Sequence, residues 1–173
     1  MKNDLGKIHI YTGNGKGKTT AAFGLALRAL GAGYRVYVIQ FMKGKNSSEL
    51  KNLKSLPKIT IKNFGSNILV SKKGQNKDKV FARQALNWAN KIMVAGRCDV
   101  IVLDEIFLAV FFNLIPISEI TKLIRNKPAG VELILTGRKA NSEIIKLADY
   151  VTEMKEIKHP YQIGLAARKG IEY

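Results

Sequence analysis

The chain is poor in several features that would take it out of the ordinary globular class. Its 173 residues include one cysteine, Cys98, so no internal disulfide can form, and we expect this thiol to be a small core residue. The longest apolar run, Ile106–Phe112, has seven residues, whereas a membrane-spanning helix needs about 20. A transmembrane protein is therefore excluded. Residues 1–6 lack the apolar segment of a signal peptide, so we expect a cytoplasmic protein.

Acidic residues are also scarce. There are 13 Asp and Glu against 29 Lys and Arg, which gives a formal net charge of +16. Such an excess favours anionic partners such as nucleic acid, a membrane surface or a phosphorylated small molecule. Residues 43–79 hold ten lysines and two acidic residues, which is half of the excess. Because these lysines are not interleaved with aromatic residues or arginine, we predict a solvated surface with no nucleic-acid and no membrane partner.

The hydrophobic pattern alternates between strand-like and helix-like segments. The expected strands are 7–12, 35–41, 58–64, 99–103, 131–135 and 150–153, and the expected helices are 18–32, 77–95, 118–126 and 140–147, with a buried helix or turn at 106–112. Ser118, after Pro116, is the predicted N-cap of its helix. Several strands are apolar on both faces, which is typical of a parallel sheet covered on both sides. We predict one open α/β domain over residues 1–173.

A glycine-rich segment, TGNGKGKTT at 12–20, joins the first expected strand to the first expected helix. Glycines allow backbone N–H groups to turn inward, and these donors bind an anion together with the helix N-terminus. The segment is a shortened form of the phosphate-loop pattern, since Thr12 stands where the first glycine is expected. The predicted ATP-binding residues are Gly13, Asn14, Gly15, Lys16, Gly17, Lys18, Thr19 and Thr20. Among them, Lys18 is suited to the outer phosphate oxygens and Thr19 to Mg²⁺.

A second motif is VIVLDE at 100–105, an apolar strand that ends in two carboxylates. The carboxyl ends of parallel strands border the crevice in which α/β folds bind ligands. Asp104 or Glu105 is therefore suited to hold Mg²⁺, which prefers oxygen ligands. Together the two motifs predict a P-loop NTPase-like, mainly parallel α/β fold that binds a magnesium nucleotide.

Segments from end to end of the chain resemble the ATP:corrinoid adenosyltransferases of the P-loop class. The matching segments are YTGNGKGKTTAAFGLALRALGAGYRV (11–36), VIQFMKG (38–44), DVIVLDE (99–105), LILTGR (133–138), ADYVTEM (148–154) and KHPYQIGLAARKGIEY (158–173). The shortened loop followed by AAFG, and the ending GIEY, are both typical of that family.

The resemblance implies a particular reaction. The Co(I) centre of a reduced corrinoid such as cob(I)alamin attacks the 5′ carbon of ATP, and triphosphate leaves as one unit. The loop then manages the leaving group, with Lys18 and Thr19 as catalytic residues and with Thr19, Glu105 and, as second choice, Asp104 as Mg²⁺ ligands. The resemblance further implies an electron donor or reductase, a homodimer, and a place in cobalamin biosynthesis or salvage.

Several other residues have more than one interpretation. Family members often carry paired aromatics after the third strand, whereas this chain has Ile68 and Val70 there, which leaves the corrinoid-contacting residues open. Arg138 is suited equally to contact triphosphate or to cap a turn. We expect His9, His159 and Trp88 to have structural roles.

Two other functions stay open from the sequence. A nucleic-acid-associated ATPase shares the loop and strand motifs and suits the basic charge, and it would release ADP and phosphate. A non-catalytic nucleotide-binding module would release no product. The phosphate product therefore distinguishes these functions from an adenosyltransferase.

Overall fold

The computed structural model describes residues 4–44, 49–66 and 75–171. In this part of the chain, six strands form one sheet in the order β3-β2-β4-β5-β1-β6, and every neighbouring pair is parallel. The strands are β1 (Ile8–Thr12), β2 (Val36–Phe41), β3 (Ile59–Phe64), β4 (Val100–Asp104), β5 (Glu132–Thr136) and β6 (Tyr150–Glu153). The predicted open parallel α/β fold is confirmed.

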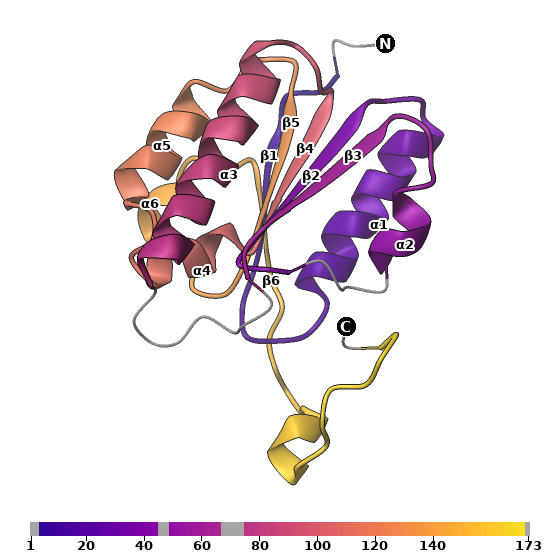
Figure 1. Ribbon diagram of the computed structural model, residues 1–173, viewed down its shortest axis with the longest axis vertical. Helices are drawn as coiled ribbons and strands as arrows, with labels where there is room; N and C mark the ends of the chain where they lie inside the picture. Colours follow the sequence, from indigo (N-terminus) through magenta and orange to yellow (C-terminus); the bar gives the residue numbers. More distant parts are fainter. Residues whose placement is uncertain (1–3, 45–48, 67–74, 172–173) are drawn as a thin grey trace.

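Helices cover both faces of the sheet (Figure 1). On one face lie α1 (Lys18–Gly31) and α2 (Glu49–Leu53). On the other face lie α3 (Asn76–Val94), α4 (Ile106–Phe111), α5 (Ile117–Arg125) and α6 (Ser142–Ile145). The two apolar layers that result meet the sheet from opposite sides, as expected for strands that are apolar on both faces.

The central strand β4 shows how the sequence produces these layers. All five of its residues are buried. Because side chains alternate along a strand, Ile101 and Leu103 pack with α3, α4 and α5, whereas Val100 and Val102 pack with α1 and α2. The strand therefore places Asp104 at the middle of the carboxyl edge of the sheet.

Two local predictions differ from the structure. The segment around Glu49–Leu53 is not predicted as a helix, yet it forms α2 because Leu50 and Leu53 are buried in the layer with α1. The predicted N-cap Ser118 is wrong: Pro116 is the N-cap of α5, and the helix begins at Ile117. Proline fixes its own φ near the helical value, so the first turn of the helix can begin at the residue that follows it. Of the two alternatives for 106–112, the helix is correct: it forms α4, which ends at Phe111 and has Ile106, Phe107 and Ala109 buried.

The chain leaves the sheet after β6 and continues as an exposed C-terminal arm, residues 154–171, which Figure 1 shows in yellow below the body. The arm contains the short 3-10 helix η1 (Pro160–Ile163). His159 caps it, because its Nδ1 accepts a hydrogen bond of 3.1 Å from the Tyr161 backbone N–H. This contact supports the structural role that was expected for His159. None of the described helices is long and apolar enough to cross a bilayer.

Because the single thiol is buried, we expect it to react slowly with alkylating reagents. Cys98 is 3% exposed, and its burial raises the pKa of the thiol to about 11. The thiolate is the form that reacts with iodoacetamide. At pH 8 we expect complete alkylation of the protein unfolded in urea and, over the same time, no adduct on the native protein. Intact-mass spectrometry measures both reactions. Equal rates in the native and unfolded states would contradict the buried position.

Candidate nucleotide site

The glycine-rich loop lies between β1 and α1 at the carboxyl edge of the sheet. Gly13 and Gly17 have φ values of +95° and +112°, in the left-handed region that favours glycine, and Gly17 is the N-cap of α1. The backbone thus enters α1 through a glycine turn that no side chain caps. The first N–H groups of a helix have no partner within the helix, so this N-terminus is suited to an anion.

The segment after β6 packs against this loop. The Gly15 backbone N–H donates to the Met154 carbonyl at 2.6 Å, and the Met154 N–H donates to the Thr12 carbonyl at 2.8 Å. A Cβ on Gly13 would lie 2.4 Å from the Met154 oxygen, and one on Gly15 would lie 2.7 Å from it. The close approach of the Met154 backbone therefore requires glycine at positions 13 and 15.

Gly13→Ala tests this packing. The variant combines an unfavourable φ with a backbone clash, so we expect it to lose about 1–3 kcal/mol of stability and to weaken ATP binding. The matched control is Gly24→Ala in the interior of α1, where an added Cβ meets no atom within 4 Å. That control should gain about 0.5–1 kcal/mol, because alanine favours the helix. Urea unfolding and ATP titration measure both effects, and equal behaviour of the two variants would refute the packing.

Lys18 is folded into the loop. Its Nζ donates to the Gly15 carbonyl at 2.6 Å, and the residue is only 7% exposed. Burial lowers the pKa of its ammonium, although the nearby Glu105 carboxylate acts in the opposite direction. A phosphate oxygen is a stronger acceptor than the carbonyl and would restore a full opposite charge to this group.

Asp104 is the centre of a buried polar network. It is 0% exposed. Its Oδ1 accepts from the Thr19 hydroxyl at 2.9 Å and the Thr136 hydroxyl at 2.7 Å. Its Oδ2 accepts from Gln40 Nε2 at 2.9 Å and Lys43 Nζ at 2.7 Å. Burial by itself would raise the pKa of Asp104, but Lys43 and the hydrogen bonds outweigh it, and the net shift is downward.

Glu105 differs from its neighbour in having an unused oxygen. The residue has a φ of 64°, and its backbone N–H donates to the Thr136 hydroxyl at 2.9 Å. Its Oε2 is buried and has no hydrogen-bond partner within the described residues. Burial, and then the charge of Asp104, raises the pKa of this carboxyl group. A buried carboxylate without a partner is suited to receive a cation.

The residues present fit a magnesium ion. The Thr19 hydroxyl and the two carboxylates supply hard oxygen ligands, and Glu105 has one oxygen that needs a partner. Among residues 4–44, 49–66 and 75–171, no cluster of three or more His, Cys, Asp or Glu could hold a metal ion. Thr19 and the two carboxylates would form only part of a coordination sphere, which Mg²⁺ commonly completes with phosphate oxygens and water.

The remaining predicted ATP-binding residues line the outside of the loop. Asn14, Lys16 and Thr20 are exposed. Arg138 is exposed beside the loop, and its charge acts on both Lys18 and Glu105. Three residues that the sequence did not single out belong to the network: Gln40, Lys43 and Thr136.

The residues with expected structural roles lie elsewhere. His9 Nε2 and Glu132 Oε1 are 2.6 Å apart, and the imidazole stacks on Tyr150. Trp88 packs against Tyr37 with ring centroids 5.6 Å apart. These contacts support the structural interpretation. Ile68 and Val70 lie outside the described residues.

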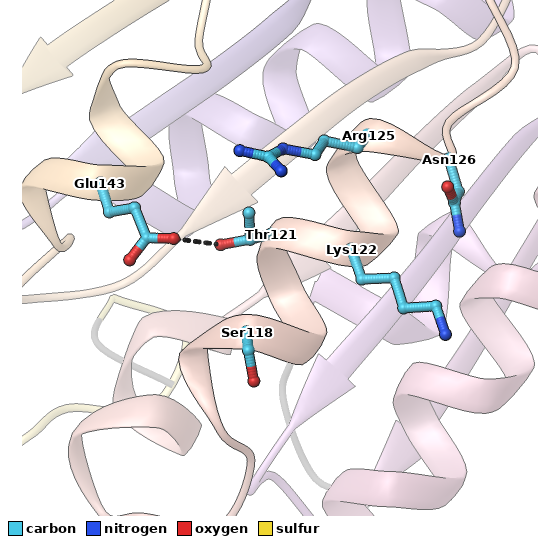
Figure 2. A pocket seen from close by; sticks show the side chains of 6 residues that line it. All are labelled: Ser118, Thr121, Lys122, Arg125, Asn126 and Glu143. Carbon is cyan, nitrogen blue, oxygen red and sulfur yellow. Dashed lines mark hydrogen bonds between the residues drawn. The ribbon is translucent and has the colours of Figure 1, made fainter.

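A separate surface pocket of about 350 Å³ lies between α5 and α6 (Figure 2). Its lining residues are Ser118, Thr121, Lys122, Arg125, Asn126 and Glu143. The Thr121 hydroxyl donates to Glu143 Oε1 at 3.1 Å across it, and the Lys122 and Arg125 side chains point in different directions. None of the predicted site residues lines this pocket.

Comparisons with known proteins agree with the geometry. Residues 4–173 match the family "ATP:corrinoid adenosyltransferase BtuR/CobO/CobP". The chain is 33% identical to the corrinoid adenosyltransferase of Escherichia coli K12, over 99% of this chain and 88% of that protein. It is 32% identical to the corrinoid adenosyltransferases of Salmonella typhimurium and Pseudomonas aeruginosa, which it covers to 88% and 86%. The chain belongs to the ATP:corrinoid adenosyltransferase family, as the motifs of its sequence indicated.

Proposed function

We propose that this enzyme transfers the 5′-deoxyadenosyl group of ATP to the Co(I) centre of a reduced corrinoid and releases triphosphate. The observation that carries the proposal is the meeting of two groups at the carboxyl edge of the sheet. One is an anion-binding loop with the buried Lys18 ammonium. The other is the acidic end of β4, where Asp104 holds Thr19 and Glu105 keeps an unused oxygen.

The reaction needs little acid–base chemistry from the protein. The electron pair of Co(I) forms the cobalt–carbon bond at C5′, the C5′–oxygen bond breaks, and its electron pair leaves with the triphosphate. No proton changes place in this step, so no general base is required. The loop N–H groups and Lys18 stabilise the charge that develops on the leaving triphosphate. They also hold C5′ in place for attack.

We further propose Mg²⁺ as the cofactor. When bound, Mg²⁺ neutralises part of the triphosphate charge. Thr19 and Glu105 would hold it. Asp104 is already the acceptor of four hydrogen bonds, so in this arrangement it orients the Thr19 hydroxyl.

An anaerobic assay tests the transfer. The protein is mixed with ATP, Mg²⁺ and chemically reduced cob(I)alamin, and the corrinoid spectrum is followed. We expect conversion to a light-sensitive alkylcobalamin that requires both ATP and protein. A cobalamin spectrum that does not change while ATP is hydrolysed to ADP would contradict the proposal and favour the nucleic-acid-associated ATPase.

We propose an electron donor and a homodimer as partners, and a cytoplasmic location. The electron donor is required because the attacking cobalt must be in the Co(I) state. The homodimer is supported by the C-terminal arm, in which Ile157, Tyr161 and Ile163 are 89%, 76% and 82% exposed, and by the exposed edge strand β6. A second copy that covers these side chains would remove this apolar surface from water.

Light scattering during gel filtration tests the homodimer. We expect the full chain to elute with the mass of a dimer and Ile163→Ser with a larger monomer fraction. Val80→Ser, which removes an exposed apolar side chain on α3, is the control and should remain dimeric. A monomeric wild type would contradict this part of the proposal.

A further inference from the structure

The Lys43 ammonium lies beside Asp104 and Thr19, close to the proposed position of the magnesium ion. It follows β2 by two residues, after Met42, whose φ is 56°. Its Nζ lies 2.7 Å from Asp104 Oδ2 and 3.4 Å from the Thr19 hydroxyl oxygen. The Lys43 side chain is 31% exposed and the Asp104 side chain 0%, so the ammonium covers the buried carboxylate from the solvent side.

The turn that carries Lys43 is held firmly by the end of β3. The Met42 N–H donates to the Phe64 carbonyl at 2.8 Å. Asn63 Nδ2 donates to the Gly44 carbonyl at 2.7 Å. Gly65 allows the close approach, since a Cβ there would lie 2.6 Å from the Lys43 backbone nitrogen. The position of the ammonium is therefore set by the fold and is not that of a loose surface lysine.

Lys43 contacts one oxygen that the proposed metal ion would use, that of the Thr19 hydroxyl, and it also contacts Asp104, which orients this hydroxyl. The Thr19 hydroxyl donates its proton to Asp104, so its lone pairs are available to a cation. A divalent ion that binds Thr19 beside Asp104 must share the Thr19 oxygen with the Lys43 ammonium, which lies 3.4 Å from that oxygen and 2.7 Å from Asp104 Oδ2. Two cations bound at neighbouring oxygens lie close together and repel strongly in a partly buried site. The ammonium and the metal ion therefore exclude each other.

We propose that Lys43 is a tethered cation that takes the place of the metal ion when the nucleotide is absent and competes with Mg²⁺ for the site. This inference rests on the magnesium role in the proposed function. In the metal-free enzyme Lys43 neutralises Asp104, whose charge would otherwise be buried without compensation. When ATP brings its phosphates, the metal ion and the displaced ammonium both gain oxygen partners. Lys43 thereby makes metal binding depend on the nucleotide and is a positioning residue.

The test uses Mn²⁺ as a spectroscopic probe of the full-length protein without nucleotide. Free Mn²⁺ is measured by electron paramagnetic resonance for wild type, Lys43→Met, Lys43→Gln and Lys79→Met. Lys79 is an exposed lysine of α3, so its variant matches the change in net charge. We expect the Lys43 variants to bind Mn²⁺ about tenfold more tightly than wild type, and Lys79→Met to bind as wild type does.

Thermal unfolding provides the second measurement. In EDTA the Lys43→Met variant should melt below wild type, and Mn²⁺ should raise its Tm by more than it raises that of wild type. Lys43→Gln keeps a hydrogen-bond donor for Asp104, so it remains informative if Lys43→Met does not fold. Unchanged or weaker Mn²⁺ affinity in the Lys43 variants would overturn this inference alone. Failure of every variant to bind Mn²⁺, even with ATP, would overturn the magnesium role as well, whereas the adenosyl-transfer assay tests the reaction independently.

Discussion

Lys18→Ala is expected to lower kcat for adenosyl transfer by about 100- to 1,000-fold, because one preorganised charge at the leaving group is lost. In the structure the ammonium is buried in the loop and donates a hydrogen bond to the Gly15 carbonyl. That carbonyl is a weaker partner than the triphosphate. The effect should therefore appear in the chemical step, and stopped-flow measurement of the corrinoid spectrum at saturating ATP isolates it.

The Lys18 result needs a control for folding and for charge. Lys79→Ala removes the same charge from the exposed side of α3 and should keep wild-type kcat. Both variants should unfold within a few degrees of wild type, because neither lysine forms an ion pair within residues 4–44, 49–66 and 75–171. If Lys18→Ala kept more than half of the wild-type kcat, the loop would not act on the leaving group.

Asp104→Asn is expected to cost about 3–5 kcal/mol of stability, as is typical when one partner of a buried charge network is removed. Asp104 accepts four hydrogen bonds with its two oxygens. An asparagine has only one oxygen, and its amide group is a donor that would face other donors. Urea unfolding at neutral pH measures the loss. Asp78→Asn is the control: that carboxylate is also buried and accepts from the Gln75 backbone N–H at the start of α3, and its loss should cost about 1 kcal/mol.

The contribution of Asp104 to the free energy of unfolding should decrease as the pH falls into the acid range. The folded state lowers the pKa of this carboxyl group, so its contribution is present above the ordinary carboxyl pKa and is lost as pH falls through the lowered folded pKa. The difference in unfolding free energy between wild type and Asp104→Asn should therefore be constant near neutral pH and shrink in acid. A difference that grows in acid would contradict the assigned network.

Local patterns in the sequence were sufficient for the fold and for half of the site. The strand β4 is recognisable from its continuous apolar run, and the phosphate loop is recognisable from glycine spacing between a strand and a helix. Both signals lie within short windows. Ser118 and α2 show the limit, because a helix boundary and a short polar helix depend on tertiary packing.

The other half of the site comes from strand order. Gln40, Lys43 and Thr136 reach Asp104 from 64, 61 and 32 residues away, because β2 and β5 lie on either side of β4. The sequence does contain these polar residues: Gln40 and Lys43 lie in VIQFMKG, and Thr136 lies in LILTGR. Their meeting at Asp104 can be predicted only when the order of the strands is known. The same holds for Met154, whose contact with the loop depends on β6 lying beside β1.

The phosphate product distinguishes adenosyl transfer from phosphoryl transfer. Phosphorus NMR of the anaerobic reaction with cob(I)alamin and ATP identifies what leaves the nucleotide. We expect one triphosphate for each alkylated cobalt, with no ADP formed in the same period. ADP and inorganic phosphate in place of triphosphate would show that the loop serves phosphoryl transfer, and adenosyl transfer would then be refuted.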